Sequence, residues 1–433
     1  MEKCSQAPSA FFYMIIFKFM LYFNQVKLLH TTRSNILPLL LFICLFTVVS
    51  CASTKNEPQD FYEPSEEAIY EEELPHDSDS ITLLFAGDIM AHSVNYSISD
   101  YPKIWRDVKY LIEPCDLAFA NIEAPIDETQ KWQSYPNFNM PQAYVEAAID
   151  AGFDVFSLCN NHTNDQGLNG IKETIKSSEK LVKRSKERNE QIYFSGLKDG
   201  KSAAFTYNLI EKNGWKILFL PITEILNRPN YSDHINYVEN SEKARKEFIK
   251  YVKTLRQANA CDLMVLSIHA YEVEYTRNVT EAQNNYYMEL LDAGVDILWA
   301  NHAHIIKDRK YVFNNKTQSQ KLIMYANGNT ISGQRTAPDF NSKNPIGERD
   351  NTGDGLIVKL TFKKQEGFPP RITASQNIFI TTYINTANEY VVKPLNQEFI
   401  EYLKEVPRNN WARYVQRRIE INNNYTKDYI IWQ

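Results

Sequence analysis

Residues 151–167 read AGFDVFSLCNNHTNDQG and join an apolar run to a polar one. The run FDVFSL at 153–158 is typical of a buried strand, and the string CNNH at 159–162 follows it directly. Residues 142–151 before this strand and 168–187 after it have the spacing of amphipathic helices. A helix–strand–helix order of this kind predicts an α/β protein, with polar side chains just beyond the carboxyl end of a strand.

The same alternation continues on both sides of this stretch. Further strand candidates are 81–86, 116–120, 215–220, 262–268, 295–300 and 322–326, and further helix candidates are 241–258 and 280–293. Several of these strands are continuously apolar, which favours sheets covered on both faces by helices or by a second sheet. Strands at 355–362 and 371–381 follow without a helix between them, and helices at 396–405 and 408–420 come last. We therefore expect an antiparallel addition and a helical tail.

Composition excludes several classes of protein. The 433 residues are 43% apolar and 23% charged, which are ordinary globular values and rule out wholesale disorder. The net charge of −6 is concentrated in residues 52–79, where ten acids accompany one lysine. The part from residue 80 onward carries no net charge, so it offers no basic field for nucleic acid. We expect no nucleic-acid partner.

The first fifty residues have the features of a signal peptide. The apolar run at 36–49 follows basic residues and is too short for a comfortable transmembrane helix. It ends in the string VVSC, which resembles the bacterial lipoprotein box, so we predict that Cys51 is lipidated. A second apolar run at 10–23 is explained if translation begins at Met20. The alternative is a short membrane helix that contains Cys51.

These features divide the chain into four predicted segments. They are a signal peptide at 1–50, a lipidated cysteine with an acidic tether at 51–79, a main domain at 80–385 and a C-terminal extension at 386–433. The acidic, proline-containing tether favours an extended spacer. A lipid anchor would hold the protein on a membrane in the cell envelope, facing the periplasm or the exterior.

Polar side chains follow six of the predicted strands, at the point where each strand ends. They are Asp88; Asn121 with Glu123; Asn161 with His162; His269; His302 with His304; and Asn327 with Asn329. Only seven histidines follow the leader, and four of them lie at these positions. Imidazole and carboxylate are the ligands that Mn, Fe and Zn prefer, and an amide oxygen can complete the coordination. The pattern therefore predicts one or two divalent metal ions. Phosphate-binding loops, dinucleotide fingerprints and GxSxG nucleophile motifs are absent.

Each of these residues also has a purely structural interpretation when it is taken alone. A Gly-Asp pair such as that at Asp88 is a common turn, and Glu123 could cap a helix. A core histidine with satisfied hydrogen bonds is the usual alternative for His269. Side chains two residues apart, as in His302 and His304, point the same way only in extended backbone. The order of the whole set at strand ends is what favours the metal interpretation.

The ordered set resembles the capsule synthesis protein CapA family, also described as poly-gamma-glutamate capsule biosynthesis proteins, whose domain is related to the calcineurin-like metallophosphoesterases. The resemblance covers most of 81–385. The matching motifs are Gly87-Asp88, Asn121-x-Glu123-x-Pro125, the stretch 151–167, His269 with Glu274-Tyr275, His302-x-His304 and Asn327-Gly328-Asn329. It implies a metallophosphoesterase-like, four-layer α/β/β/α sandwich with a C-terminal strand and helix extension.

The resemblance also implies roles for individual residues. Asp88, Glu123, Asn161, His162, His269, His302 and His304 would hold the metal, with His162 and His269 taking part in catalysis and Asn121, Glu274 and Asn329 contacting the substrate. Two departures affect this assignment. Related phosphoesterases have Asp-x-His where this chain has Met90, and a thioether is a poor ligand for a hard ion. The Glu-Tyr pair after His269 also lies one residue later than in the family, so Glu272 competes with Glu274 for the role of the family's glutamate.

By this resemblance, the chain is a lipoprotein that acts in the synthesis, retention or export of a surface polymer such as poly-gamma-glutamate. Metal-dependent hydrolysis of an anionic polymer or a phosphoester is the implied chemistry, and membrane-bound polymer synthesis proteins are the implied partners. Two alternatives stay open. The chain could be a non-catalytic scaffold or polymer-binding subunit of a membrane synthesis complex, or a secreted metal-dependent phosphodiesterase unrelated to capsule.

Overall fold

The computed structural model describes residues 79–200 and 204–433. The predicted leader at 1–50, the lipidation site Cys51 and all but the last residue of the acidic segment 51–79 lie outside the described residues. Within the described part of the chain, no helix combines the length and apolar character needed to span a bilayer.

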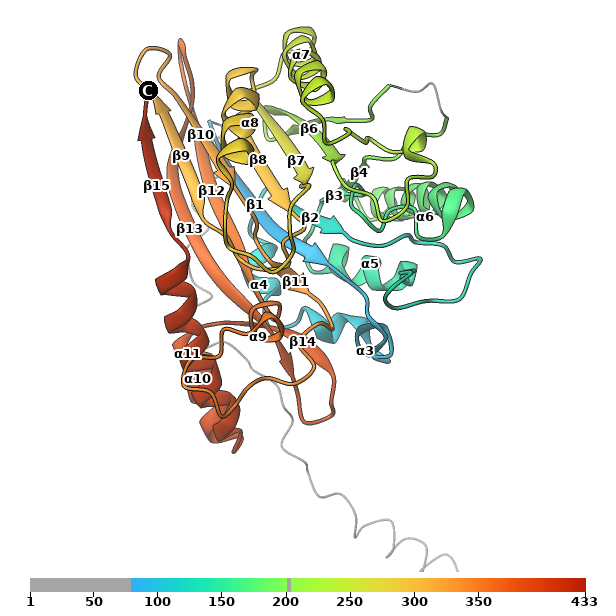
Figure 1. Cartoon of the computed structure of the whole chain (residues 1–433), viewed down its shortest axis with the longest axis vertical. Helices are drawn as coiled ribbons and strands as arrows, with labels where there is room; N and C mark the ends of the chain where they lie inside the picture. Colours follow the sequence, from blue (N-terminus) through green and yellow to red (C-terminus); the bar gives the residue numbers. More distant parts are fainter. Residues whose placement is uncertain (1–78, 201–203) are drawn as a thin grey trace, which may run out of the picture. The chain divides into compact units, whose positions relative to one another are not determined.

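Two sheets form the centre of the described region (Figure 1). The strands of the first sheet, in spatial order, are β14 (Tyr390–Pro394), β13 (Phe368–Ile384), β12 (Asp354–Gln365), β1 (Ser80–Ile89), β2 (Leu117–Ile122), β3 (Val155–Ser157) and β4 (Tyr193–Ser195), with β11 (Asn329–Ile331) also pairing with β1. Strands β1 to β4 and β11 are parallel, whereas β12, β13 and β14 add on in antiparallel fashion. This sheet therefore contains the predicted antiparallel addition.

The second sheet is built in a similar way. Its strands, in spatial order, are β15 (Asp428–Trp432), β9 (Arg309–Asn314), β10 (Ser319–Met324), β8 (Ile297–Asn301), β7 (Leu263–His269), β6 (Trp215–Thr223) and β5 (Asn208–Lys212). Its central strands β10, β8, β7 and β6 are parallel. Both sheets thus present the carboxyl ends of parallel strands, which is where the polar motifs lie in the sequence.

The two sheets pack face to face through large aromatic side chains. Phe85 stacks on Phe119 at a centroid distance of 4.6 Å, and Phe119 meets Phe219 of the other sheet edge to face at 5.5 Å. Trp299 is fully buried between the sheets, and its Nε1 donates to the carbonyl of Ala86 at 2.8 Å. This bond satisfies the indole N–H and joins β8 to β1 next to the motif of Asp88.

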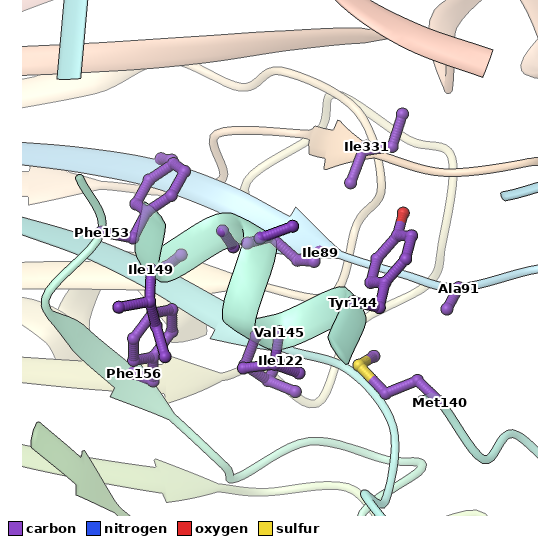
Figure 2. Close-up of a cluster of buried hydrophobic side chains, with 14 of the residues drawn as sticks. Ile89, Ala91, Ile122, Met140, Tyr144, Val145, Ile149, Phe153, Phe156 and Ile331 are labelled. Carbon is purple, nitrogen blue, oxygen red and sulfur yellow. The ribbon is translucent and has the colours of Figure 1, made fainter. Parts of the chain in front are cut away.

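Helices cover the outer face of each sheet. Helices α5 (Gln142–Asp150) and α6 (Gly167–Glu187) pack on the first sheet, and α7 (Glu242–Ala258) and α8 (Glu281–Asp292) pack on the second. Figure 2 shows the first of these contacts, in which Tyr144, Val145 and Ile149 of α5 lie against Ile89 and Ile122 of the sheet. The predicted α/β/β/α order of layers is confirmed.

The C-terminal segment contacts both sheets. Helices α10 (Gln397–Glu405) and α11 (Asn409–Tyr425) share a third apolar cluster with the end of the first sheet, centred on Tyr383 and Trp411. Strand β15 then joins the edge of the second sheet. Short helices complete the fold: α3 (Ser93–Tyr96), η2 (Tyr101–Ile104), α4 (Lys109–Ile112), η3 (Ser232–His234) and α9 (Glu348–Asn351).

Candidate metal centre

The predicted polar residues meet where parallel strands of the two sheets end. Asp88 lies in β1, Glu123 follows β2, His269 ends β7, and Asn329 begins β11. Strands β1 and β11 come unusually close at Gly87, because a Cβ atom there would lie 1.8 Å from the carbonyl oxygen of Gly328. Only glycine permits this approach, which lets the amide of Asp88 donate to that same carbonyl at 3.0 Å.

Asp88, Glu123 and His269 form the first of two groups that could hold a metal ion. Their ligand atoms all lie within 4.8 Å of one another, and all three side chains are buried. Both carboxylate oxygens of Glu123 lack a hydrogen-bond partner, and so does Nδ1 of His269. A buried carboxylate without a donor is costly unless a cation compensates it. These residues therefore fit a divalent cation.

The second group consists of Glu274, His302 and His304. His302 and His304 have positive φ angles of 107° and 56°, so the backbone between them is not the extended form that the sequence spacing led us to consider. The left-handed conformation turns both rings into the same space, with their centroids 6.0 Å apart. Such backbone is strained for a residue with a Cβ atom and is found preferentially at functional sites.

The two groups are joined through His269. Its Nε2 lies 3.1 Å from Nδ1 of His302, 3.0 Å from Oδ1 of Asn161 and 3.7 Å from Oε1 of Glu123. Nε2 of His304 lies 3.6 Å from the same oxygen of Glu123. One imidazole proton cannot satisfy all of these atoms, whereas a cation can accept an electron pair from each.

Asparagine side chains hold two of the acidic and imidazole groups in place. Asn121 Nδ2 donates to Oδ1 of Asp88 at 2.8 Å, and Asn329 Oδ1 lies 3.1 Å from Nδ1 of His304. The resemblance implied that these two asparagines contact the substrate. In the structure Asn121 contacts the candidate ligand Asp88, and Asn329 contacts His304 as well as Gln334 and Thr352.

His162 lies beside the two groups but belongs to neither. Its Nδ1 is 2.7 Å from Oδ2 of Asp165, which also accepts from the amide of Phe138 at 2.8 Å. The ring packs edge to face on Phe138 at 4.6 Å, and Asn227 Nδ2 lies 3.2 Å from Nδ1. The sequence analysis did not assign roles to Asp165 or Asn227. Asp165 could have been recognised from its position three residues after His162, but nothing in the sequence points to Asn227.

Burial and neighbouring charges set the protonation of the site. Burial, together with the charge of Asp88, raises the pKa of Glu123 well above its ordinary value. Burial and the neighbouring imidazoles lower the pKa of His269 well below its ordinary value, and burial with His304 lowers that of His302 to about 3. Burial also acts to lower the pKa of His304, but the hydrogen bond and charge of Asp88 raise it overall. Neutral His269 and His302 have the form that binds metal.

Comparison with known proteins gives the family. The model of the family described as bacterial capsule synthesis protein PGA_cap matches residues 82–334. The chain belongs to this family. The chain is 25% identical over 314 residues to the capsule biosynthesis protein CapA of Bacillus anthracis, covering 69% of this chain and 71% of that protein. It is 22% identical over 267 residues to the PGA biosynthesis protein CapA of Bacillus subtilis strain 168, covering 60% of this chain and 65% of that protein.

Solved structures also match, at lower similarity. The calcineurin-like phosphoesterase YfkN of Bacillus subtilis matches with a TM-score of 0.36 and 11% identity, covering 78% of this chain and 99% of that chain. A hypothetical protein from Thermus thermophilus matches with a TM-score of 0.35 and 17% identity, covering 69% of this chain and 98% of that chain.

The structure places the residues of the two departures from the family pattern, Met90 and Glu272, in different surroundings. Met90 belongs to the apolar cluster on the outer face of the first sheet, so its thioether packs with that core. Glu272 forms a buried ion pair with Lys307 at 2.6 Å and also accepts from Gln283. Glu274 is the acid that groups with the histidines.

Proposed function

We propose that this capsule synthesis protein is a metal-dependent hydrolase that acts on an anionic surface polymer in the cell envelope. The observation that carries the proposal is Glu123, a fully buried carboxylate without a hydrogen-bond partner that faces Asp88 and His269. A side chain kept only for stability would not leave two buried oxygens unpaired. The family membership and the names of the two relatives support capsule or poly-gamma-glutamate as the class of polymer.

Asp88, Glu123 and His269 would hold one ion, and Glu274, His302 and His304 offer a place for a second. A divalent ion such as Mn, Fe or Zn in such a site polarises an oxygen of the substrate and supplies a nucleophile at neutral pH. The chain's own contribution is orientation and proton transfer. Asn121 and Asn329 fix Asp88 and His304, so that these side chains do not need to reorganise when a ligand arrives.

His162 is the residue best placed to move a proton. Asp165 holds its Nδ1 at 2.7 Å, which fixes the ring and leaves Nε2 as the nitrogen that exchanges a proton with substrate or leaving group. His269 contacts the candidate ligands directly, so we assign it to metal binding and only through that to catalysis. Asp165 is then a positioning residue that acts through His162.

A test separates metal binding from proton transfer. The full chain, purified in detergent, is analysed for Mn, Fe and Zn and assayed on poly-glutamate and on a small phosphodiester. We expect His162→Gln to keep the metal of the parent and to lower turnover by roughly a hundredfold or more. Asp165→Asn should keep the metal and shift the pH dependence of the remaining activity, which a purely structural role would not do.

The two substrates distinguish the proposal from the phosphodiesterase alternative. Turnover of the phosphodiester alone would favour a phosphodiesterase unrelated to capsule. A metal-free parent, even after exposure to the three metals, would contradict the proposal.

A non-catalytic scaffold is the second candidate function, and Met90 favours it. Because this side chain packs in the outer core, the first strand supplies one ligand, Asp88, where related phosphoesterases supply two. A scaffold would capture membrane-bound polymer synthesis proteins from the membrane fraction equally well before and after metal is stripped. For the proposed localisation, mass spectrometry of the mature N-terminus tests whether Cys51 carries lipid.

A further inference from the structure

A basic groove lies on the two C-terminal helices, outside the residues that the family model matches. It has a volume of about 460 Å³ and is bordered by α10, α11 and the loop that carries Lys343. Its floor includes Ile400 of α10 and Ala412 of α11, which are 2% and 4% exposed. The two helices and the loop that precedes α9 meet at one end of the described region (Figure 1).

Four cationic side chains line this groove, and no acid does. They are Lys343, Lys404, Arg413 and Arg417. The first three are exposed and the fourth is half-buried. Lys404 lies one helical turn after Ile400 and Arg417 one turn after Arg413, so each helix directs its basic residues to the same side. The nearest acids on the two helices are Glu401, three residues before Lys404, and Glu420, which accepts from Gln416 at 3.0 Å; neither acid lines the groove.

The positive charge of the groove is not neutralised by the protein. Within residues 79–200 and 204–433, none of the four cations forms an ion pair with a carboxylate, although many other surface cations do. Arg417 donates to the carbonyls of Phe340 and Ser342, and Arg413 donates to the side chain of Asn410, all of which are uncharged acceptors. Four uncompensated charges around one concave surface concentrate a field that attracts an anion with several charges.

We infer that this groove binds a segment of an extended polyanionic chain whose carboxylates pair with Lys343, Lys404 and Arg413. Arg417 adds its positive charge while its three guanidinium nitrogens donate to backbone carbonyls. A recessed apolar floor suits the methylene groups of such a chain. A membrane surface is flat, and proteins that bind it present apolar side chains outward, whereas Ile400 and Ala412 lie inward. Charge complementarity and concave shape therefore favour a polymer strand over anionic lipid.

The groove and the metal centre are connected by one loop, so a single polymer chain could contact both. Gln334 accepts from Asn329 at 2.9 Å, next to His304, and Lys343 is nine residues further along. Nine residues span at most about 32 Å. A long polymer would bind in the groove while one of its bonds, elsewhere along the polymer, lies at the metal centre. The inference thus rests on the proposed polymer function and adds a second contact to it.

The experiment measures binding of fluorescently labelled poly-glutamate to the full chain in detergent by fluorescence anisotropy at low salt. The groove variant is Lys404→Glu with Arg413→Glu. The matched control is Lys180→Glu with Lys183→Glu on α6, which makes the same change in net charge at exposed positions on the other side of the first sheet. Vesicles containing anionic phospholipid form a second arm. Metal content is measured on every sample.

We expect the groove variant to bind poly-glutamate about tenfold more weakly or worse, the control to match the parent, and the affinity of the parent to fall with added salt. Equal loss in both variants would show a general charge effect and overturn the inference. Binding to anionic vesicles without binding to poly-glutamate would overturn it in favour of a membrane surface. A parent that holds metal but binds no polymer would contradict only the inference that the groove binds polymer. A metal-free parent that still binds polymer would contradict only the proposal that the protein is a metal-dependent hydrolase.

Discussion

The substitution Glu123→Gln tests directly whether this buried acid is kept for a metal ion. Ligand atoms of Asp88 and Glu123 lie within 4.8 Å of each other, and burial together with the charge of Asp88 raises the pKa of Glu123, which favours the neutral acid when no metal is bound. The neutral acid can share its proton with Asp88, and the amide of glutamine can donate to Asp88 in the same way. The metal-free variant should therefore melt no lower than the metal-free parent.

The rise in Tm on adding metal should, in contrast, be much smaller in the variant than in the parent. At a metal concentration a hundred times its Kd, binding stabilises the parent by about 2.7 kcal/mol. For a folded region of this size, that corresponds to a rise of roughly 4 °C in Tm. Glu123→Gln should abolish most of this rise, because an amide is a weaker ligand than a carboxylate. Differential scanning calorimetry with and without Mn, Fe or Zn measures both effects.

Glu272→Gln provides the matched control, since Glu272 is also buried but is paired with Lys307 and Gln283. Breaking a buried ion pair costs about 3 to 5 kcal/mol, so this variant should melt several degrees lower in both states while keeping its response to metal. The reasoning would be refuted if metal-free Glu123→Gln melted well below the parent, or if it kept the full rise on metal addition.

Two further substitutions test other parts of the structure. Asp354→Asn should lower the free energy of unfolding by about 3 to 5 kcal/mol at neutral pH, because it leaves the buried Arg335 and Arg418 without their carboxylate. Burial raises the pKa of Asp354, but the charges of Arg418 and Arg335 lower it overall, so its stabilisation is complete above the ordinary carboxyl range and is lost as the pH falls through the folded pKa. Urea unfolding should therefore show the parent approaching the variant below a pH of about 4. Gly87→Ala should reduce metal content in elemental analysis, since its Cβ would displace the backbone of Gly328; unchanged metal content would show that this close approach is not needed.

The sequence was informative about the fold because the central strands are buried on both faces. Every strand and helix that the apolar pattern predicted is present, to within a few residues at the ends. The strands that were missed are β4, β5, β9, β11, β14 and β15. Strands β4 and β11 have three residues each, and β5 and β15 are edge strands with exposed side chains, so none carries a long apolar run. Strands β11 and β15 also pair with strands that lie far away in sequence, β1 and β9.

The candidate site was predicted for a related reason. Parallel strands deliver their carboxyl ends to one place, so residues that follow such strands converge whatever their separation in sequence. Asp88, Glu123, His269, His302 and His304 follow this rule. Asn227 also lies beyond a parallel strand, four residues after β6 ends at Thr223, and it reaches His162 from a loop. Its position depends on the path of that loop, which residue type and spacing do not encode.

The positive φ angles of His302 and His304 bring their two rings together, which their spacing in the sequence did not predict. Extended backbone would place both rings on one face by simple alternation, but both residues instead adopt positive φ, at a cost of order 1 to 3 kcal/mol each. The amide of Tyr275 donates to the carbonyl of Ala303 at 3.0 Å, and Asn329 holds His304, so contacts from two other segments stabilise this conformation. The conformation places Nε2 of His304 3.6 Å from Glu123 and Nδ1 of His302 3.1 Å from His269. A divalent cation bound by these residues would supply the interaction that offsets this strain.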